Sequence, residues 1–187
     1  MDKITVAVIL GTKREGRLSE RAAKWVAEQG RQRGDTEIIF VDPGDFDLPP
    51  DGAPEDGRDP KYSEITEKAD AFFIVTPEYN NSFPSSLKRL LDSEYENYLH
   101  KPVMLAGVSN GPWGGVRACI ALQPVCHSLG LVNIPKKLYF PKVQEIFDEQ
   151  GNMNQSYVAD YAKNTGTAYD ELVWFARALK AAKQQQS

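Results

Sequence analysis

The sequence predicts an α/β fold in which helices cover both faces of a parallel sheet. Two observations favour it. Short, continuous apolar runs recur along the chain, and longer amphipathic segments separate them. Continuous apolar runs are typical of strands that are buried on both faces, whereas one-sided strands alternate apolar and polar residues. Strict alternation of strand and helix then favours a parallel sheet with right-handed crossovers.

The predicted strands follow the apolar runs in chain order. The four clear runs are Ile4–Leu10, Ile38–Val41, Ala71–Val75 and Val103–Val108. A weaker fifth run covers Leu131–Ile134 and resumes at Leu138–Phe140. Apolar residues with helical spacing predict the intervening helices, at about Ser19–Gln32, Ser63–Ala69, Ser85–Leu91, Val116–Leu129 and Ser156–Lys183.

Length and composition indicate one domain spanning residues 1–187, because 187 residues fall within the usual size of a single domain. The net charge of −4, with both signs intermixed, gives no reason to expect nucleic acid or a membrane surface as partner. No apolar run reaches the ~20 residues of a membrane helix. Cys119 and Cys126 suit a reducing compartment better than a disulfide framework, so we expect a cytoplasmic protein.

The segment Asp42–Lys61 reads as a long, acidic loop with five prolines. Loops of this length are commonly functional or mobile. The sequence leaves two interpretations open: a solvated loop, or a lid or subunit contact.

The loop after the first predicted strand has the features of a phosphate site. It runs from Gly11 to Ser19 and opens the first helix. A helix N-terminus offers free N–H groups and a partial positive charge, both of which attract phosphate. Thr12 and Ser19 add hydroxyl groups, and Arg14 and Arg17 add guanidinium groups. The alternative is that Ser19 only caps the helix and both arginines are solvated.

Two common phosphate motifs do not match this loop. A Walker A loop needs a lysine and a magnesium-binding hydroxyl where this chain has Arg17 and Leu18. The dinucleotide fingerprint needs a glycine where this chain has Lys13. The expected ligand is therefore a monophosphate that needs no metal, and FMN fits this description.

Two further loops supply groups suited to a flat polar ring. They follow the third and fourth predicted strands, at Pro77–Lys88 and Ser109–Arg117. Open α/β sheets bind ligands at the carboxyl ends of their strands. Tyr79, Phe83 and Trp113 could cover the faces of a ring, or could simply pack. Backbone N–H groups of the glycine-rich stretch could donate to its electron-rich edge.

A serine hydrolase is an alternative, because Gly107–Gly111 matches the G-x-S-x-G pattern around Ser109. Its acid and histidine should follow in that order, yet no Asp or Glu lies between Ser109 and His127. The two histidines, His100 and His127, have no nearby Cys or carboxylate cluster, so no metal site is expected.

The chain resembles the NADPH-dependent FMN reductase family, a branch of the flavodoxin-like proteins. Three motifs carry the resemblance: Gly11-Thr12-x-Arg14-x-Gly16-x-x-Ser19, Pro77-Glu78-Tyr79-Asn80 and Ser109-x-Gly111-x-x-Gly114-Gly115-x-Arg117. The resemblance implies a three-layer flavodoxin-like sandwich with strand order 2-1-3-4-5. It also implies that the first loop holds the FMN phosphate, and the other two the ribityl chain and ring. The candidate FMN-binding residues are Gly11, Thr12, Arg14, Arg17, Ser19, Pro77, Glu78, Tyr79, Asn80, Asn81, Ser109, Asn110, Gly111, Trp113, Gly114 and Gly115.

The sequence departs from the family pattern at two positions. Arg17 stands where a small hydroxyl residue is common, and Ser19 where asparagine is common. Arg17 could fold over the flavin phosphate, reach a phosphate of the nicotinamide cofactor or point into water.

The predicted function is an NAD(P)H-dependent, FMN-containing oxidoreductase with ping-pong kinetics. The flavin carries the chemistry, so no catalytic acid or base is demanded. The acceptor could be a quinone, an azo compound, a metal ion or free flavin. Family members commonly form dimers or tetramers, so a homodimer or homotetramer is expected. The alternatives are a flavodoxin-type electron carrier, and a flavin- or nucleotide-sensing module without turnover.

Overall fold

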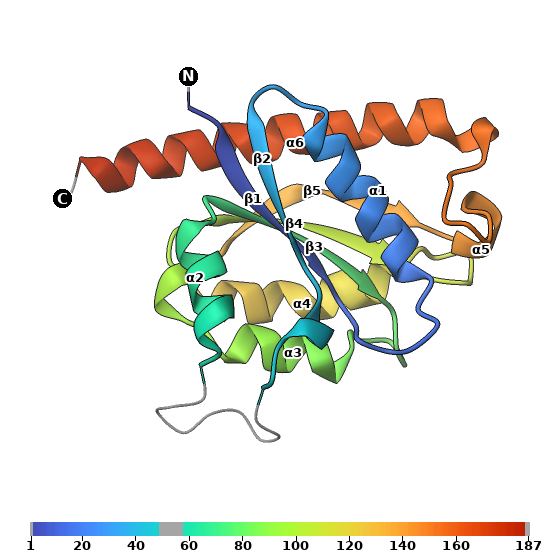
Figure 1. The fold of residues 1–187 in the computed structure, drawn as a ribbon, viewed down its shortest axis with the longest axis horizontal. Helices are drawn as coiled ribbons and strands as arrows, with labels where there is room; N and C mark the ends of the chain where they lie inside the picture. The colour runs from blue at the N-terminus through green and yellow to red at the C-terminus, as the bar shows by residue number, and fades with distance from the viewer. Residues whose placement is uncertain (1, 49–57, 186–187) are drawn as a thin grey trace.

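A five-stranded parallel sheet lies between two layers of helices in the computed structural model, which describes residues 2–48 and 58–185 (Figure 1). The strands are β1 (Ile4–Leu10), β2 (Thr36–Val41), β3 (Ala71–Pro77), β4 (Pro102–Val108) and β5 (Val132–Phe140). Their order in the sheet is β2-β1-β3-β4-β5, and each neighbouring pair is parallel. The predicted fold class and strand order are therefore confirmed.

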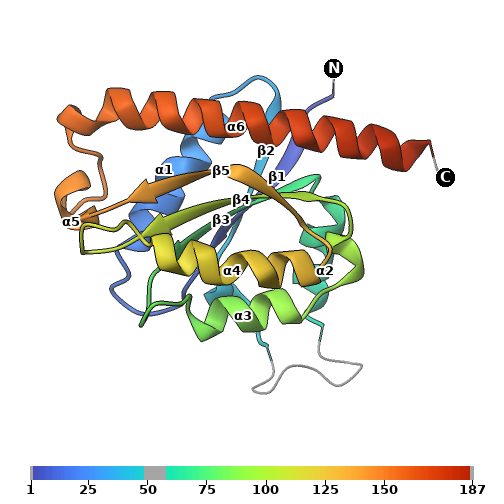
Figure 2. The same cartoon turned by 180° about the vertical axis from the view of Figure 1, so that it is seen from behind.

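The helices divide between the two faces of the sheet. Helices α1 (Ser19–Arg31) and α6 (Gln155–Gln184) cover one face (Figures 1 and 2). Helices α2 (Pro60–Lys68), α3 (Ser85–Asp92) and α4 (Val116–Ser128) cover the other. The short elements are η1 (Pro43–Asp45), η2 (Glu96–Tyr98) and α5 (Val143–Ile146).

The central strands contribute to both hydrophobic layers because successive side chains point to opposite faces. In β3, Phe73 and Val75 pack with α1 and α6, whereas Phe72 and Ile74 pack against α2, α3 and α4. All seven residues of β4 are buried. This two-sided burial explains why the sequence shows continuous apolar runs.

The structure differs from the predicted elements mainly at their ends. Helix α2 begins at Pro60, three residues before the predicted start, because the Asp59 side chain accepts hydrogen bonds from the Lys61 and Tyr62 N–H groups. The two apolar pieces of the last strand form one strand, β5, with a register irregularity opposite Val103–Leu105. Pro135 lies in this irregular stretch, where an edge strand tolerates a missing N–H donor.

The predicted long loop Asp42–Lys61 is described in part. It begins with η1, and the Leu48 carbonyl accepts a hydrogen bond from Arg89 at 2.5 Å. Arg58 lies 3.5 Å from the buried carboxylate of Glu94. Residues 49–57, on which the two interpretations of this loop depend, lie outside the described residues.

The described helices include none with the length and apolar character that a membrane crossing requires.

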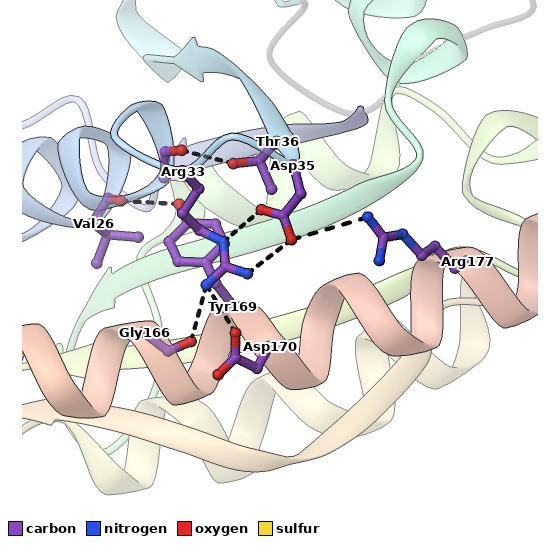
Figure 3. A network of polar contacts seen from close by, with 9 residues as sticks. Val26, Arg33, Asp35, Thr36, Gly166, Tyr169, Asp170 and Arg177 are labelled. Carbon is purple, nitrogen blue, oxygen red and sulfur yellow. Dashed lines mark hydrogen bonds and ion pairs between the residues drawn. The ribbon is translucent and has the colours of Figure 1, made fainter. Parts of the chain in front are cut away.

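A polar network joins α6 to the turn between α1 and β2 (Figure 3). Arg33 makes two hydrogen bonds to Asp35, at 2.8 and 2.9 Å, and one to Asp170 on α6, at 2.9 Å. The Arg33 contact lowers the pKa of Asp35. The buried Tyr169 hydroxyl donates to the Val26 carbonyl of α1 at 2.9 Å. Charged hydrogen bonds of this kind orient α6 on the sheet.

Gly30 of α1 packs tightly against Tyr169 of this network. A Cβ added to Gly30 would lie 2.5 Å from the Tyr169 Oη and 2.5 Å from the Ile38 Cδ1. Tyr169 is buried and hydrogen-bonded, so its ring has little room to move. Gly166 on α6 is the opposite case, because a Cβ added there would meet no heavy atom within 4 Å.

We expect Gly30→Ala to destabilise the protein by about 1–3 kcal/mol, because overpacking outweighs the better helix propensity of alanine. Gly166→Ala is the matched control and should stabilise by about 0.5–1 kcal/mol, since it removes a helix-interior glycine in open space. Urea denaturation of both variants measures the difference. A Gly30→Ala variant as stable as the wild type would contradict this packing.

Candidate functional site

The connections after β1, β3 and β4 meet at one end of the sheet, beside α5 (Figure 2). They enclose a cavity of about 320 Å³, which we call the three-loop cleft. Its lining residues are Arg14, Gly16, Arg17, Leu18, Ser19, Pro77, Glu78, Tyr79, Val108, Ser109, Asn110 and Val143. Residues far apart in the sequence therefore share one site at the carboxyl ends of the strands, as predicted for an open α/β sheet.

Hydrogen bonds and close packing against buried groups fix the backbone of the first loop. The Gly11 N–H donates to the Val75 carbonyl at 2.8 Å, and a Cβ on Gly11 would lie 2.7 Å from Thr76. The buried Thr12 hydroxyl accepts from the Arg14 N–H and is hydrogen-bonded to the Tyr79 hydroxyl, both at 3.2 Å. Gly11 and Thr12 thus support the loop, and neither lines the three-loop cleft.

Ser19 presents a hydroxyl to the cleft at the first turn of α1. The N-cap residue is Leu18, so Ser19 is not the helix cap that the alternative interpretation required. The Ser19 Oγ is buried, and the described residues provide it with no hydrogen-bond partner. Such orphaned hydroxyls are uncommon in folded proteins, and an unmet donor at a helix N-terminus is suited to an anion.

Arg17 is turned toward carboxylates. Its Nη2 is hydrogen-bonded to the Asp42 carboxylate, and its Nε lies 3.4 Å from the Glu20 carboxylate. Asp42 also accepts from the Gly44 N–H at 2.8 Å and so caps η1. Arg17 therefore ties the first loop to the segment after β2, while its side chain still lines the cleft.

The second loop forms a tight turn at the rim. Tyr79 and Ser82 exchange backbone hydrogen bonds of 2.8 and 2.9 Å. The two residues between them, Asn80 and Asn81, have φ values of 48° and 66°. Asparagine tolerates this left-handed conformation better than most residues, which explains the Asn-Asn pair.

Glu78 joins the second loop to the third. Its Oε2 accepts from the Arg117 N–H at 3.2 Å, and its Oε1 lies 3.3 Å from the Arg117 guanidinium. The N-cap of α4 is Gly115, which has no side chain to satisfy that N–H group. Glu78 thus caps α4 from a different loop, and Arg117 also donates to Asn81 at 2.9 Å.

The third loop lies against the end of β4, and glycine makes this possible. Gly115 has φ +79°, and a Cβ there would lie 2.4 Å from the Val108 N. Gly114 is also buried with positive φ. Both glycines shape the backbone behind the cleft. Trp113 beside them is 65% exposed and does not line the cleft.

The structure brings half of the predicted residues into the cleft wall and places the others around it. The lining includes Arg14, Arg17, Ser19, Pro77, Glu78, Tyr79, Ser109 and Asn110, and it does not include Gly11, Thr12, Asn80, Asn81, Gly111, Trp113, Gly114 and Gly115, which belong to the same three loops. Sequence reasoning did not select Val143, which begins α5. A single helical turn has no periodicity that could have indicated it. Nor did it select Asp42, whose partner Arg17 is distant in sequence.

The geometry excludes the hydrolase interpretation. The Ser109 hydroxyl donates to the Gly111 carbonyl at 2.9 Å. His127 lies at the far end of α4, about 16 Å along the helix from Val116 at 1.5 Å per residue.

Burial raises the pKa of both the Cys119 and Cys126 thiols to about 12, so neither supplies a reactive thiolate.

Residues 4–145 match the family described as NADPH-dependent FMN reductase. An NAD(P)H-dependent FMN reductase of Schizosaccharomyces pombe is 36% identical over 125 residues, which cover 60% of this chain and 62% of that protein. An NADPH azoreductase of a Bacillus species is 27% identical over 163 residues, covering 84% of this chain and 88% of that protein.

Solved structures show the same fold. The flavoenzyme FerB, an NAD(P)H:acceptor oxidoreductase of Paracoccus denitrificans, superposes with a TM-score of 0.72 at 24% identity. The superposition covers 93% of this chain and 98% of FerB.

We expect Glu78→Ala to lower the free energy of unfolding by about 0.5–2 kcal/mol, the usual effect of removing a helix cap. Arg117→Ala is the control, because it removes the exposed ion pair and keeps the cap; its effect should be about 0–1 kcal/mol. Chemical denaturation gives both values, and hydrogen exchange reports the Arg117 amide directly. Equal losses in the two variants would show that the ion pair, and not the cap, matters.

Proposed function

The chain belongs to the NADPH-dependent FMN reductase family, and from this premise we propose that it is an NAD(P)H-dependent oxidoreductase that holds FMN in the three-loop cleft. The observation that carries the proposal is the Ser19 hydroxyl, which is buried at the start of α1 without a partner among the described residues. A phosphate oxygen would complete its hydrogen bonding.

The residues at this end of the cleft fit a phosphate monoester. The first N–H groups of α1 have no helical partners, and they add a partial positive charge. Arg14 lines the same wall. The described residues contain no group of three or more His, Cys, Asp or Glu side chains that could hold a metal ion. The proposed phosphate contacts are therefore Ser19, Arg14 and the N–H groups of α1.

The second and third loops would hold the ribityl chain and ring. Glu78 and Arg117 tie these loops together, so their backbone groups are fixed before a ligand arrives. Tyr79 lines the cleft, and Trp113 is exposed in the third loop, so each offers an aromatic face that a flat substrate could meet. Bound FMN supplies hydride-transfer chemistry, and the protein orients it and tunes its electronics. The role of the protein is to position NAD(P)H and then the electron acceptor, one after the other, at the open rim of the three-loop cleft.

The acceptor we propose is a small flat molecule, either a quinone or an azo compound. The azoreductase relative supports this class. A metal ion or free flavin is the other candidate acceptor.

We further propose that residues 1–187 form a single FMN-binding domain that works in the cytoplasm as a homodimer or homotetramer. One sheet, with a helix layer on each face, supports the single domain. Trp113 and Ile120 are large apolar residues, 65% and 58% exposed, which lie just before α4 and in its second turn. Exposed apolar residues grouped in this way are typical of contact surfaces.

Anaerobic mixing of the FMN-loaded protein with NADPH tests the enzyme proposal. We expect rapid bleaching of the flavin colour without any other protein, followed by recovery when a quinone is added. Stopped-flow absorbance measures both steps. Colour that persists until a separate reductase is supplied would instead identify an electron carrier of the flavodoxin type.

We expect Ser19→Ala to weaken FMN binding by about 0.5–1.5 kcal/mol, the net value of one hydrogen bond. The apoprotein should not lose stability, because the variant removes a buried hydroxyl that has no partner among the described residues. Fluorescence titration with FMN and thermal denaturation of the apoprotein give the two values.

Thr165→Val is the matched control for this experiment. Thr165 lies on α6, and its hydroxyl is likewise buried without a partner in the part of the chain that the structure describes. We expect no change in FMN affinity for this variant. Unchanged affinity in Ser19→Ala would remove Ser19 from the phosphate site.

A further inference from the structure

A cavity of about 310 Å³ lies at the amino ends of β3 and β4, at the opposite end of these strands from the three-loop cleft, and we call it the lysine cavity. The residues that precede the two strands line it together with the last turns of α6. None of its described lining residues belongs to the three-loop cleft, so the cavity is separate from the proposed FMN site. Its ionisable lining residues are Glu67, Asp70, His100, Lys101, Lys180 and Lys183.

Lys101 is fixed at the wall of this cavity. Its N–H donates to the Tyr98 carbonyl at 3.1 Å, and its carbonyl accepts from the Val132 N–H at 2.9 Å. Its Nζ donates to the carbonyls of Thr66 and Glu67, in the last turn of α2, at 2.7 and 3.2 Å. An ammonium group has three N–H donors and a neutral amine has two, so Lys101 can keep both bonds when it loses a proton. Its lone pair then becomes available for reaction.

The surroundings of Lys101 favour the neutral form of its amine. Burial and the positive charge of Lys183 lower the pKa of Lys101 to about 8. The carboxylates of Asp70, Glu67 and Glu94 act in the opposite direction, and their effects are smaller. At about pH 7.5, roughly a quarter of such amines are neutral, compared with about 0.1% for a lysine of ordinary pKa. Lys101 is therefore suited to act as a nucleophile.

The lysine cavity as a whole carries a small positive charge. Lys180 is neutralised by Asp70, whose carboxylate lies 2.8 Å from the lysine Nζ. The lining residues include three lysines and two carboxylates, and the exposed His100 is counted as neutral, so the sum is about +1. A small anionic reagent is therefore not repelled from Lys101.

We propose that Lys101 is a modification site at which the neutral amine is acylated by a small acyl phosphate such as acetyl phosphate. The lysine nitrogen forms a bond to the acyl carbon, and the bond between that carbon and the phosphate oxygen breaks. Phosphate leaves with the electron pair of the broken bond, and the nitrogen releases one proton to water. The resulting amide has no positive charge and only one N–H, so one of the two α2 carbonyls loses its donor.

The alternative role of Lys101 is purely structural. A positive charge is favourable at a helix C-terminus, and Lys101 places its amine beside the last carbonyls of α2. A lysine with this role alone would stay charged and would react more slowly than a lysine in open solvent. The two roles therefore predict opposite results for acylation.

Incubation of the folded, full-length protein with acetyl phosphate at about pH 7.5 distinguishes the two roles. Mass spectrometry of peptides gives the initial rate of acetylation at each lysine. We expect Lys101 to react about tenfold faster or more than the exposed lysines Lys24 and Lys163, because far more of its amine is neutral. In protein unfolded with urea this preference should disappear, since it depends on the fold.

Lys183→Gln tests the electrostatic part of the inference. It removes the positive charge that lowers the pKa of Lys101, so the Lys101 rate should fall severalfold and its pH profile should move to higher pH. Lys163→Gln is the matched control, because Lys163 is exposed on the same helix and does not line the cavity. We expect it to leave the Lys101 rate unchanged.

Three results would overturn the inference. They are a Lys101 rate no higher than that of the exposed lysines, a preference that persists in the unfolded chain, and a Lys101 rate that Lys183→Gln leaves unchanged. The measurement needs neither FMN nor NADPH, so its outcome is independent of the proposed function.

Discussion

The burial of the central strands on both faces determines where this molecule can bind anything. Side chains from β1, β3 and β4 fill the two hydrophobic layers, so neither face of the sheet is free for a ligand. Of these three central strands only the ends reach solvent, and parallel strands bring their carboxyl ends to the same edge. The connections at that edge, together with the last residue of β3 and the first of α1, therefore carry the candidate FMN-binding groups, while the strands fix their spacing.

The connections are tied to one another as well as to the sheet. Thr12 and Tyr79 join the first loop to the second, and Glu78 and Arg117 join the second to the third. Asp42 adds a fourth segment through Arg17. A cleft built from separate loops would lose much of its binding energy to ordering them. These cross-links reduce that loss, because each loop is held by a polar contact with its neighbour.

The sequence predicted the fold almost completely and the site in part, and the difference has a physical reason. Continuous apolar runs and helical spacing are local signals, so the strands and the main helices followed from them, whereas the strand order followed from the resemblance to a known family. Ser19, Tyr79 and Asn110 could be assigned to one site because the fold places the ends of their strands together. The cap that Glu78 provides for α4 could not be read from the chain, because it joins residues 39 positions apart. The same holds for the Arg17–Asp42 pair, and α5 is too short to show periodicity.

The anchor of α6 has a consequence for how this protein can change over time. The network around Arg33 and Tyr169 (Figure 3) includes Thr36, with which β2 begins, whereas the cleft lies at the carboxyl ends of the strands. Substitutions in this network change the stability of the fold, whereas the geometry of the cleft depends on the contacts among its own loops. Most substitutions lower stability, so a protein whose stabilising contacts lie away from its cleft can accept new side chains around the cleft. Residues at the rim of the cleft can then change while the contacts of Arg33 and Tyr169 continue to hold α6 in place.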